Sequence, residues 1–194
     1  MIIRFKRTNL DFMNTTQNLK SNLASKIYLY LGELVYGAFD GTITTFAVVA
    51  GSVGAGLESN IIVILGFANL LADGFAMSIG AYLSSKSEHA KDPDKTQEKS
   101  PIYIGLSTYL AFIIMGFIPI LIYVVDLLHQ INTDLFVLSS ILTGIVFAFI
   151  GGMKAYVTKT NITKGVVQTV ILGVIAALVA YYVGDILEQL INGN

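Results

Sequence analysis

The sequence predicts an all-α membrane protein with five transmembrane helices, and three observations lead to this fold class. The chain is 54% hydrophobic and only 13% charged, with a mean hydropathy of +0.70, which is far more apolar than a soluble globular domain. Five apolar runs are each long enough to cross about 30 Å of hydrocarbon. The basic residues also alternate with these runs in the way that five crossings require.

The five expected spans lie at about 28–53, 61–84, 102–126, 135–155 and 165–187. Backbone groups inside a bilayer must bond within their own segment, so each span is expected to be a helix. Pro119 is expected to kink the third one. Together they form one transmembrane domain over residues 27–188. Residues 1–26 form an N-terminal lead, 86–100 a short charged linker and 189–194 a C-terminal tail.

The orientation follows from the charges. All twelve Lys and Arg residues lie before the first run, between the second and third, or around the loop between the fourth and fifth. The other loops and the tail contain none. Basic residues favour the cytoplasmic side, which predicts a cytoplasmic N-terminus and linker and a C-terminus on the opposite side.

Composition also excludes several functions. A net charge of −1 provides no field that would attract nucleic acid. The chain has no cysteine, so neither a disulfide framework nor a thiolate metal site is possible. No prosthetic group is expected.

Two carboxylates lie in the middle of apolar runs. Asp40 lies in the first span and Asp73 in the second, and neither run contains Lys or Arg. A charge inside a membrane costs several kcal/mol and usually has a function. The counter-charge is therefore expected to be a proton or a metal cation.

Helical spacing gathers further polar residues around these two. Glu33, Asp40 and Thr44 are seven and four residues apart and share one helix face. Asn69, Asp73 and Met77 share a face of the second helix in the same way. The candidate metal ligands are Asp40, Met77, Glu33, Asp73 and Asn69, and the candidates for proton coupling are Asp40, Asp73 and Glu33.

Small residues lie beside both polar faces. Gly37 and Gly41 form a G-x-x-x-G on the first helix, and Ala72, Ala76 and Gly80 form a similar strip on the second. Such residues let helix backbones approach closely. The first helix is therefore expected to pack against the second, with the polar faces lining a shared cavity.

The chemical types of the candidate ligands limit which metal ions are expected as the transported substrate. Carboxylate oxygens suit hard or borderline divalent cations, and a thioether favours softer ones such as iron. His89 and His129 lie outside the expected spans, which weakens a zinc or copper(II) site. Ferrous iron fits best, with manganese or cobalt as alternatives. Metal ions and protons would compete for the carboxylates, which provides a basis for exchanging one for the other.

Simpler interpretations stay open for each residue. Asp40 could be a neutral structural residue, and Asp73, next to Gly74, could brace a break in its helix. Met77 could fill the core. Glu33 could extend to the membrane surface or serve as an entrance ligand, and Lys154 could extend to the surface or pair with an acid.

Long motifs around the two carboxylates resemble the vacuolar iron transporter family. The first, at 40–51, is D-G-T-I-T-T-F-A-V-V-A-G, and the second, at 68–88, is A-N-L-L-A-D-G-F-A-M-S-I-G-A-Y-L-S-S-K-S-E. The sequences G-G-M-K at 151–154 and G-V-I-A-A-L-V-A-Y-Y-V-G at 173–184 are also similar. The resemblance covers about residues 28–187.

This resemblance implies a homodimer with a pathway at the dimer interface. It implies transport of ferrous iron, and often manganese, out of the cytosol in exchange for protons, with Asp40 and Met77 at metal-binding positions. It places the protein in the cell membrane of a prokaryote, or in a vacuolar or other endomembrane of a eukaryote.

Two departures from the family matter. About 15 residues replace the glutamate-rich metal-binding domain between spans two and three, as in the short, nodulin-like branch. Ala81 stands where the family usually has an acidic residue. The alternative function is a non-transporting scaffold or metal sensor. An intramembrane aspartyl hydrolase is disfavoured, because F-D-G and A-D-G do not match the motifs of such enzymes, so no enzymatic activity is expected.

Overall fold

The structure, a computed structural model, describes residues 25, 27–91 and 99–193. These residues form helices joined by short loops and contain no strand. The helices are α2 (Leu31–Gly54), α3 (Ser59–Lys91), α4 (Pro101–Gly116), α5 (Ile118–Leu128), α6 (Leu135–Val157) and α7 (Ile162–Asn192). The predicted N-terminal lead lies almost entirely outside the described residues.

Five segments are long and apolar enough to cross a membrane, which confirms the predicted fold class. Four are the single helices α2, α3, α6 and α7, and the fifth is the pair α4 and α5, which is bent by 49°. The bend occurs where Pro119 removes a backbone donor from the first turn of α5, as predicted. The Ser139 hydroxyl of α6 donates a hydrogen bond to the Pro119 carbonyl at 2.6 Å and so ties α6 to the bend.

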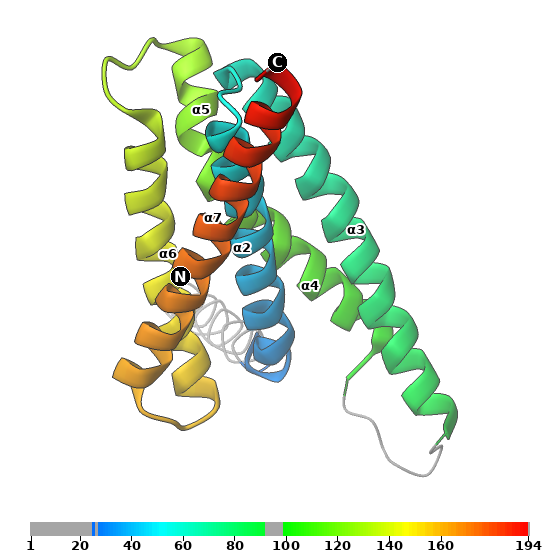
Figure 1. Cartoon of the computed structure of the whole chain (residues 1–194). Coiled ribbons are helices and arrows are strands. Elements are labelled where there is room, and N and C mark those ends of the chain that lie inside the picture. The colour runs from blue at the N-terminus through cyan, green and yellow to red at the C-terminus, as the bar shows by residue number, and fades with distance from the viewer. Residues whose placement is uncertain (1–24, 26, 92–98, 194) are drawn as a thin grey trace, which may run out of the picture.

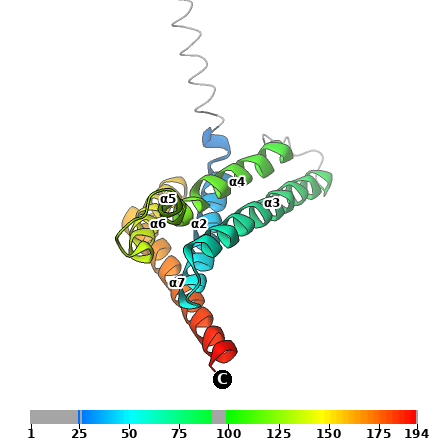
Figure 2. The same ribbon diagram turned by 90° about the horizontal axis from the view of Figure 1, so that it is seen from above.

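Helix α2 is the central element. It contacts every other described helix and packs most extensively on α4 and α7. Seen from above, the remaining helices leave α2 in three directions, as α3 with α4, α5 with α6, and α7 alone (Figure 2). Helix α3 meets α2 near the loop that joins them and then diverges from it (Figure 1).

The contacts of α2 depend on glycines. A Cβ atom on Gly51 would lie 3.2 Å from the Ala180 carbonyl oxygen of α7, and one on Gly184 would lie 3.0 Å from the Ala55 nitrogen. The two backbones therefore touch, which is the packing that small residues allow in membranes.

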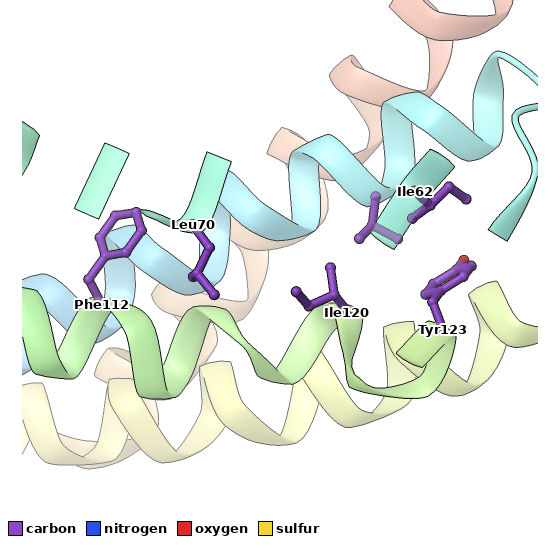
Figure 3. Packing of buried hydrophobic residues seen from close by; sticks show 6 residues of the cluster. Ile62, Leu70, Phe112, Ile120 and Tyr123 are labelled. Carbon is purple, nitrogen blue, oxygen red and sulfur yellow. The ribbon is translucent and has the colours of Figure 1, made fainter. Parts of the chain in front are cut away.

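The main apolar core lies between α3 and the bent α4–α5 pair, against one side of α2 (Figure 3). Its buried members are Val49, Ile62, Leu70, Phe112, Ile120 and Tyr123. This core fixes the rotation of α3, and with it the direction of the α3 polar face.

All the described lysines lie at one end of the bundle, which we call the basic end. It comprises the start of α2, the end of α3, the start of α4 and the α6–α7 hairpin (Figure 1). The lysines there are Lys86, Lys91, Lys99, Lys154, Lys159 and Lys164. The cytoplasmic location of this end remains a prediction from the charge rule.

The predicted boundary of the charged linker needs a correction. Residues 86–91 are helical and extend α3 beyond the expected span, so the linker 86–100 is shorter than predicted. Residues 92–98 lie outside the described part. Residues 86–91 contain no glycine or proline, so they can continue a helix, and a helix normally ends before a proline such as Pro93.

Candidate metal site

Asp40 of α2 and Asp73 of α3 form the centre of the candidate site. Both are half-buried, and they are close enough for the charge of Asp73 to act on Asp40. Neither carboxylate forms a hydrogen bond or an ion pair with another described residue. Two such carboxylates repel each other when both are ionised, so the pair favours a cation between them or a proton on one of them.

The position of Asp40 is set by close contact between α2 and α4. A Cβ atom on Gly41 would lie 2.8 Å from the Phe112 Cα, and Gly37 meets the Thr108 backbone in the same way. The hydroxyl of Thr44 donates to the backbone carbonyl of Asp40 at 2.8 Å, leaving the carboxylate itself without a bond. Glycine packing therefore fixes the position of the α2 turn that carries Asp40 relative to α4.

On α3, the predicted polar face is turned inward. Asn69, Asp73 and Met77 are all half-buried, whereas Leu71 and Ala72 between them are exposed. The helix continues without interruption from Ser59 to Lys91, so Asp73 does not brace a break. Gly74 instead brings α3 against the Phe112 ring, whose Cδ1 atom lies 3.0 Å from a Cβ built on Gly74.

Asn69 and Met77 flank Asp73 by one turn on either side. The Asn69 amide nitrogen is buried without a hydrogen-bond partner among the described residues. Buried polar groups are nearly always paired, so this amide marks a polar position that a water molecule or a ligand could fill. Met77 packs against the main apolar core and is partly buried. The Met77 side chain therefore packs in the core and also lies one helical turn from Asp73.

Glu33 lies apart from this pair. It is seven residues before Asp40, about 10.5 Å along the helix toward the basic end. Its carboxylate oxygens accept hydrogen bonds from the Lys99 ammonium at 2.8 and 3.1 Å. Sequence reasoning missed Lys99, because 66 residues separate it from Glu33 and only its position beside the third span hinted at a role.

Within the described ranges, no three His, Cys, Asp or Glu side chains gather closely enough to hold a metal ion. One chain thus provides two carboxylates within electrostatic reach of each other, with an amide and a thioether on the same α3 face as Asp73. Lys154 is exposed and pairs with no acid among the residues described, which favours the surface interpretation for it.

The small-residue strips were predicted to pack α2 against α3, and this prediction names the wrong partner helix. Gly37 and Gly41 lie against α4, and the main contacts of α3 are also with α4. The strip of Ala72, Ala76 and Gly80 is exposed, and an added Cβ on Gly80 would meet nothing within 4 Å. Large apolar side chains on the same side of α3, such as Phe75 at 62% exposure, are also uncovered.

Comparison with known proteins identifies the family. The model of the VIT family matches residues 31–92 and 88–185. A vacuolar iron transporter of Toxoplasma gondii is 38% identical over 77 residues, which is 40% of this chain and 26% of that protein. One from Plasmodium falciparum is 36% identical over 81 residues, 41% of this chain and 27% of that protein.

A longer match is found with vacuolar iron transporter homolog 4 of Arabidopsis thaliana. It is 24% identical over 168 residues, covering 81% of this chain and 83% of that protein. The match to the two apicomplexan transporters spans only about a quarter of their length. The family model covers all five candidate spans, and the chain is therefore a multi-pass membrane protein of the VIT family, the vacuolar iron transporters.

Proposed function

We propose that the protein carries ferrous iron, and also manganese, out of the cytosol in exchange for protons. The observation that carries this proposal is the open pair of Asp40 and Asp73, which lie on two candidate membrane-spanning helices within electrostatic reach of each other and have no basic partner among the described residues. A divalent cation or protons can neutralise the pair, but not both at once. Exchange follows from this competition.

The remaining candidate ligands have supporting roles in this proposal. Asn69 and Met77 extend the site along α3, the amide oxygen as a hard ligand and the thioether as a softer one that favours iron. Glu33 acts as an entrance ligand and proton acceptor nearer the basic end. The similar proteins of Toxoplasma gondii and Plasmodium falciparum are vacuolar iron transporters, which supports iron as the cargo and a vacuolar or other endomembrane location.

A homodimer completes the site. Two carboxylates, one amide oxygen and one thioether are few ligands for a divalent cation, and a second copy would double them. The uncovered face of α3, with small residues at Ala72, Ala76 and Gly80, is suited to close contact with another helix. This face lies next to the α3 polar residues, so pairing across it would bring the two sites together.

Flux measurements in proteoliposomes test the proposal. Purified protein is reconstituted with a fluorescent metal reporter, and flux of Fe²⁺ and Mn²⁺ is followed with and without a pH gradient. Asp40→Ala and Asp73→Ala should reduce flux to background, while Glu58→Ala, an exposed acid in the α2–α3 loop, should retain it.

Retained flux in Asp40→Ala would contradict the assignment of Asp40. Flux that ignores the pH gradient would contradict proton exchange. Metal binding without any flux in the intact protein would favour the alternative, a metal sensor that retains the transporter fold.

A further inference from the structure

A groove whose lining contains none of the candidate metal ligands lies on a neighbouring face of α2. It has a volume of about 410 Å³ and is bounded by α2, α6 and α7. Its lining includes Gly32, Phe39, Ile150, Lys154 and Leu172. The lining contains none of the candidate metal ligands, and its members Tyr36 and Leu172 are 58% and 41% exposed, so the groove opens on the outer surface of the chain.

The groove starts at the basic end and extends inward. Along α2 its lining reaches from Gly32 in the first turn to Phe39, seven residues and about 10.5 Å deeper. This depth is about a third of the roughly 30 Å hydrocarbon core of a bilayer. A glycerol backbone and the first part of an acyl chain match this length.

The charge at its mouth has no partner among the residues that the structure describes. Lys154 is the charged residue of the lining, and it forms no ion pair with a described residue. Lys159 and Lys164 follow in the same hairpin, and no Asp or Glu occurs from residue 135 to residue 184. The hairpin is therefore a concentrated positive charge above an apolar groove.

We propose that this groove binds an anionic phospholipid from the leaflet at the basic end. The lipid phosphate pairs with the Lys154 ammonium, and one acyl chain lies against Phe39, Ile150 and Leu172. Basic pockets between membrane helices select anionic headgroups in this way, and each lysine near the surface contributes about fivefold in affinity. The proposal is independent of metal transport.

Lipid binding to purified protein in detergent tests this directly, with phosphatidylglycerol and phosphatidylcholine of matched chains compared by native mass spectrometry. The intact protein should prefer phosphatidylglycerol, and Lys154→Gln should lower that preference about fivefold. Lys91→Gln is the matched control, because this lysine is exposed at the same end but lies on α3, away from the groove.

Gly32→Leu provides a second variant that does not depend on charge. A Cβ on Gly32 would meet nothing within 4 Å, so a side chain there fits the fold but occupies the groove mouth. It should weaken binding of both lipids at this site.

Equal binding of the two lipids by the intact protein, or an equal loss in Lys154→Gln and Lys91→Gln, would overturn the proposal. Competition by inorganic phosphate alone would also overturn it, because the site would then bind a soluble anion.

Discussion

The Lys99 ammonium holds both oxygens of the Glu33 carboxylate, at 2.8 and 3.1 Å, and so joins the start of α4 to the start of α2. A second bond supports this junction, because the Ser100 backbone nitrogen donates to the Tyr30 hydroxyl at 3.0 Å. The carboxylate proposed as an entrance ligand therefore already has a cation of its own. An incoming metal ion has to displace Lys99 before it can bind Glu33.

Lys99→Gln should therefore increase the apparent affinity for metal. An ion pair that is partly exposed contributes at most about 1 kcal/mol, so the half-saturating Mn²⁺ concentration should fall by up to about fivefold. Flux titrations in proteoliposomes measure this value, with Lys91→Gln as the control. A rise instead of a fall would mean that the ion pair serves mainly to hold α2 and α4 together.

Ala81→Glu should strengthen metal binding. Ala81 follows Met77 by one helical turn, is half-buried and continues the face of Asn69 and Asp73. A carboxylate there adds a hard, charged ligand, and charge count strongly affects divalent-cation affinity. We expect a Mn²⁺ dissociation constant lower by roughly tenfold, measured by titration of the purified protein. Ala90→Glu, exposed near the end of α3, is the control and should have no such effect.

Cysteine crosslinking tests the proposed dimer face. The chain contains no cysteine, so a single introduced thiol reports one position. Ala76→Cys lies on the uncovered strip of α3 and should form a disulfide-linked dimer upon mild oxidation in membranes. Ile145→Cys, at 63% exposure on α6, should stay monomeric on the same gels. Crosslinking through α6 but not through α3 would place the interface elsewhere.

The glycines of α2 and α3 should differ in their effect on stability. Gly41→Ala places a Cβ against the Phe112 backbone of α4, and overpacking of this kind costs about 1–3 kcal/mol. The Cβ of Gly80→Ala meets no atom of another described helix within 4 Å. Thermal unfolding in detergent should thus show a lower midpoint for Gly41→Ala than for Gly80→Ala. Equal midpoints would contradict the close contact of α2 with α4.

The features that depend on one helix at a time could be predicted from the sequence. Hydrophobic length located every span, and the missing donor of Pro119 located the bend. Helical periodicity put Asn69, Asp73 and Met77 on one face, and the core turns that face inward. Each of these properties is local, so neighbouring residues determine it.

The features that depend on which helices meet could not be predicted in the same way. A G-x-x-x-G shows that another helix backbone can approach closely, but it does not identify that helix. The prediction therefore named α3 as the partner of Gly41, whereas the structure places Gly41 against α4. The pairing of Glu33 with Lys99 likewise depends on where α4 begins relative to α2. The end of α3 was misjudged for another reason, because charged residues mark the membrane boundary without ending a helix.

Helix α3 has mechanical consequences because of its length. Its 33 residues span about 50 Å, well beyond the roughly 30 Å of hydrocarbon, and no break separates Asp73 from Lys91. It therefore acts as a rigid lever with one arm in the membrane and the other beyond it. A push or a torque applied to residues 86–91 would rotate or tilt Asp73 relative to Asp40 without any intervening hinge.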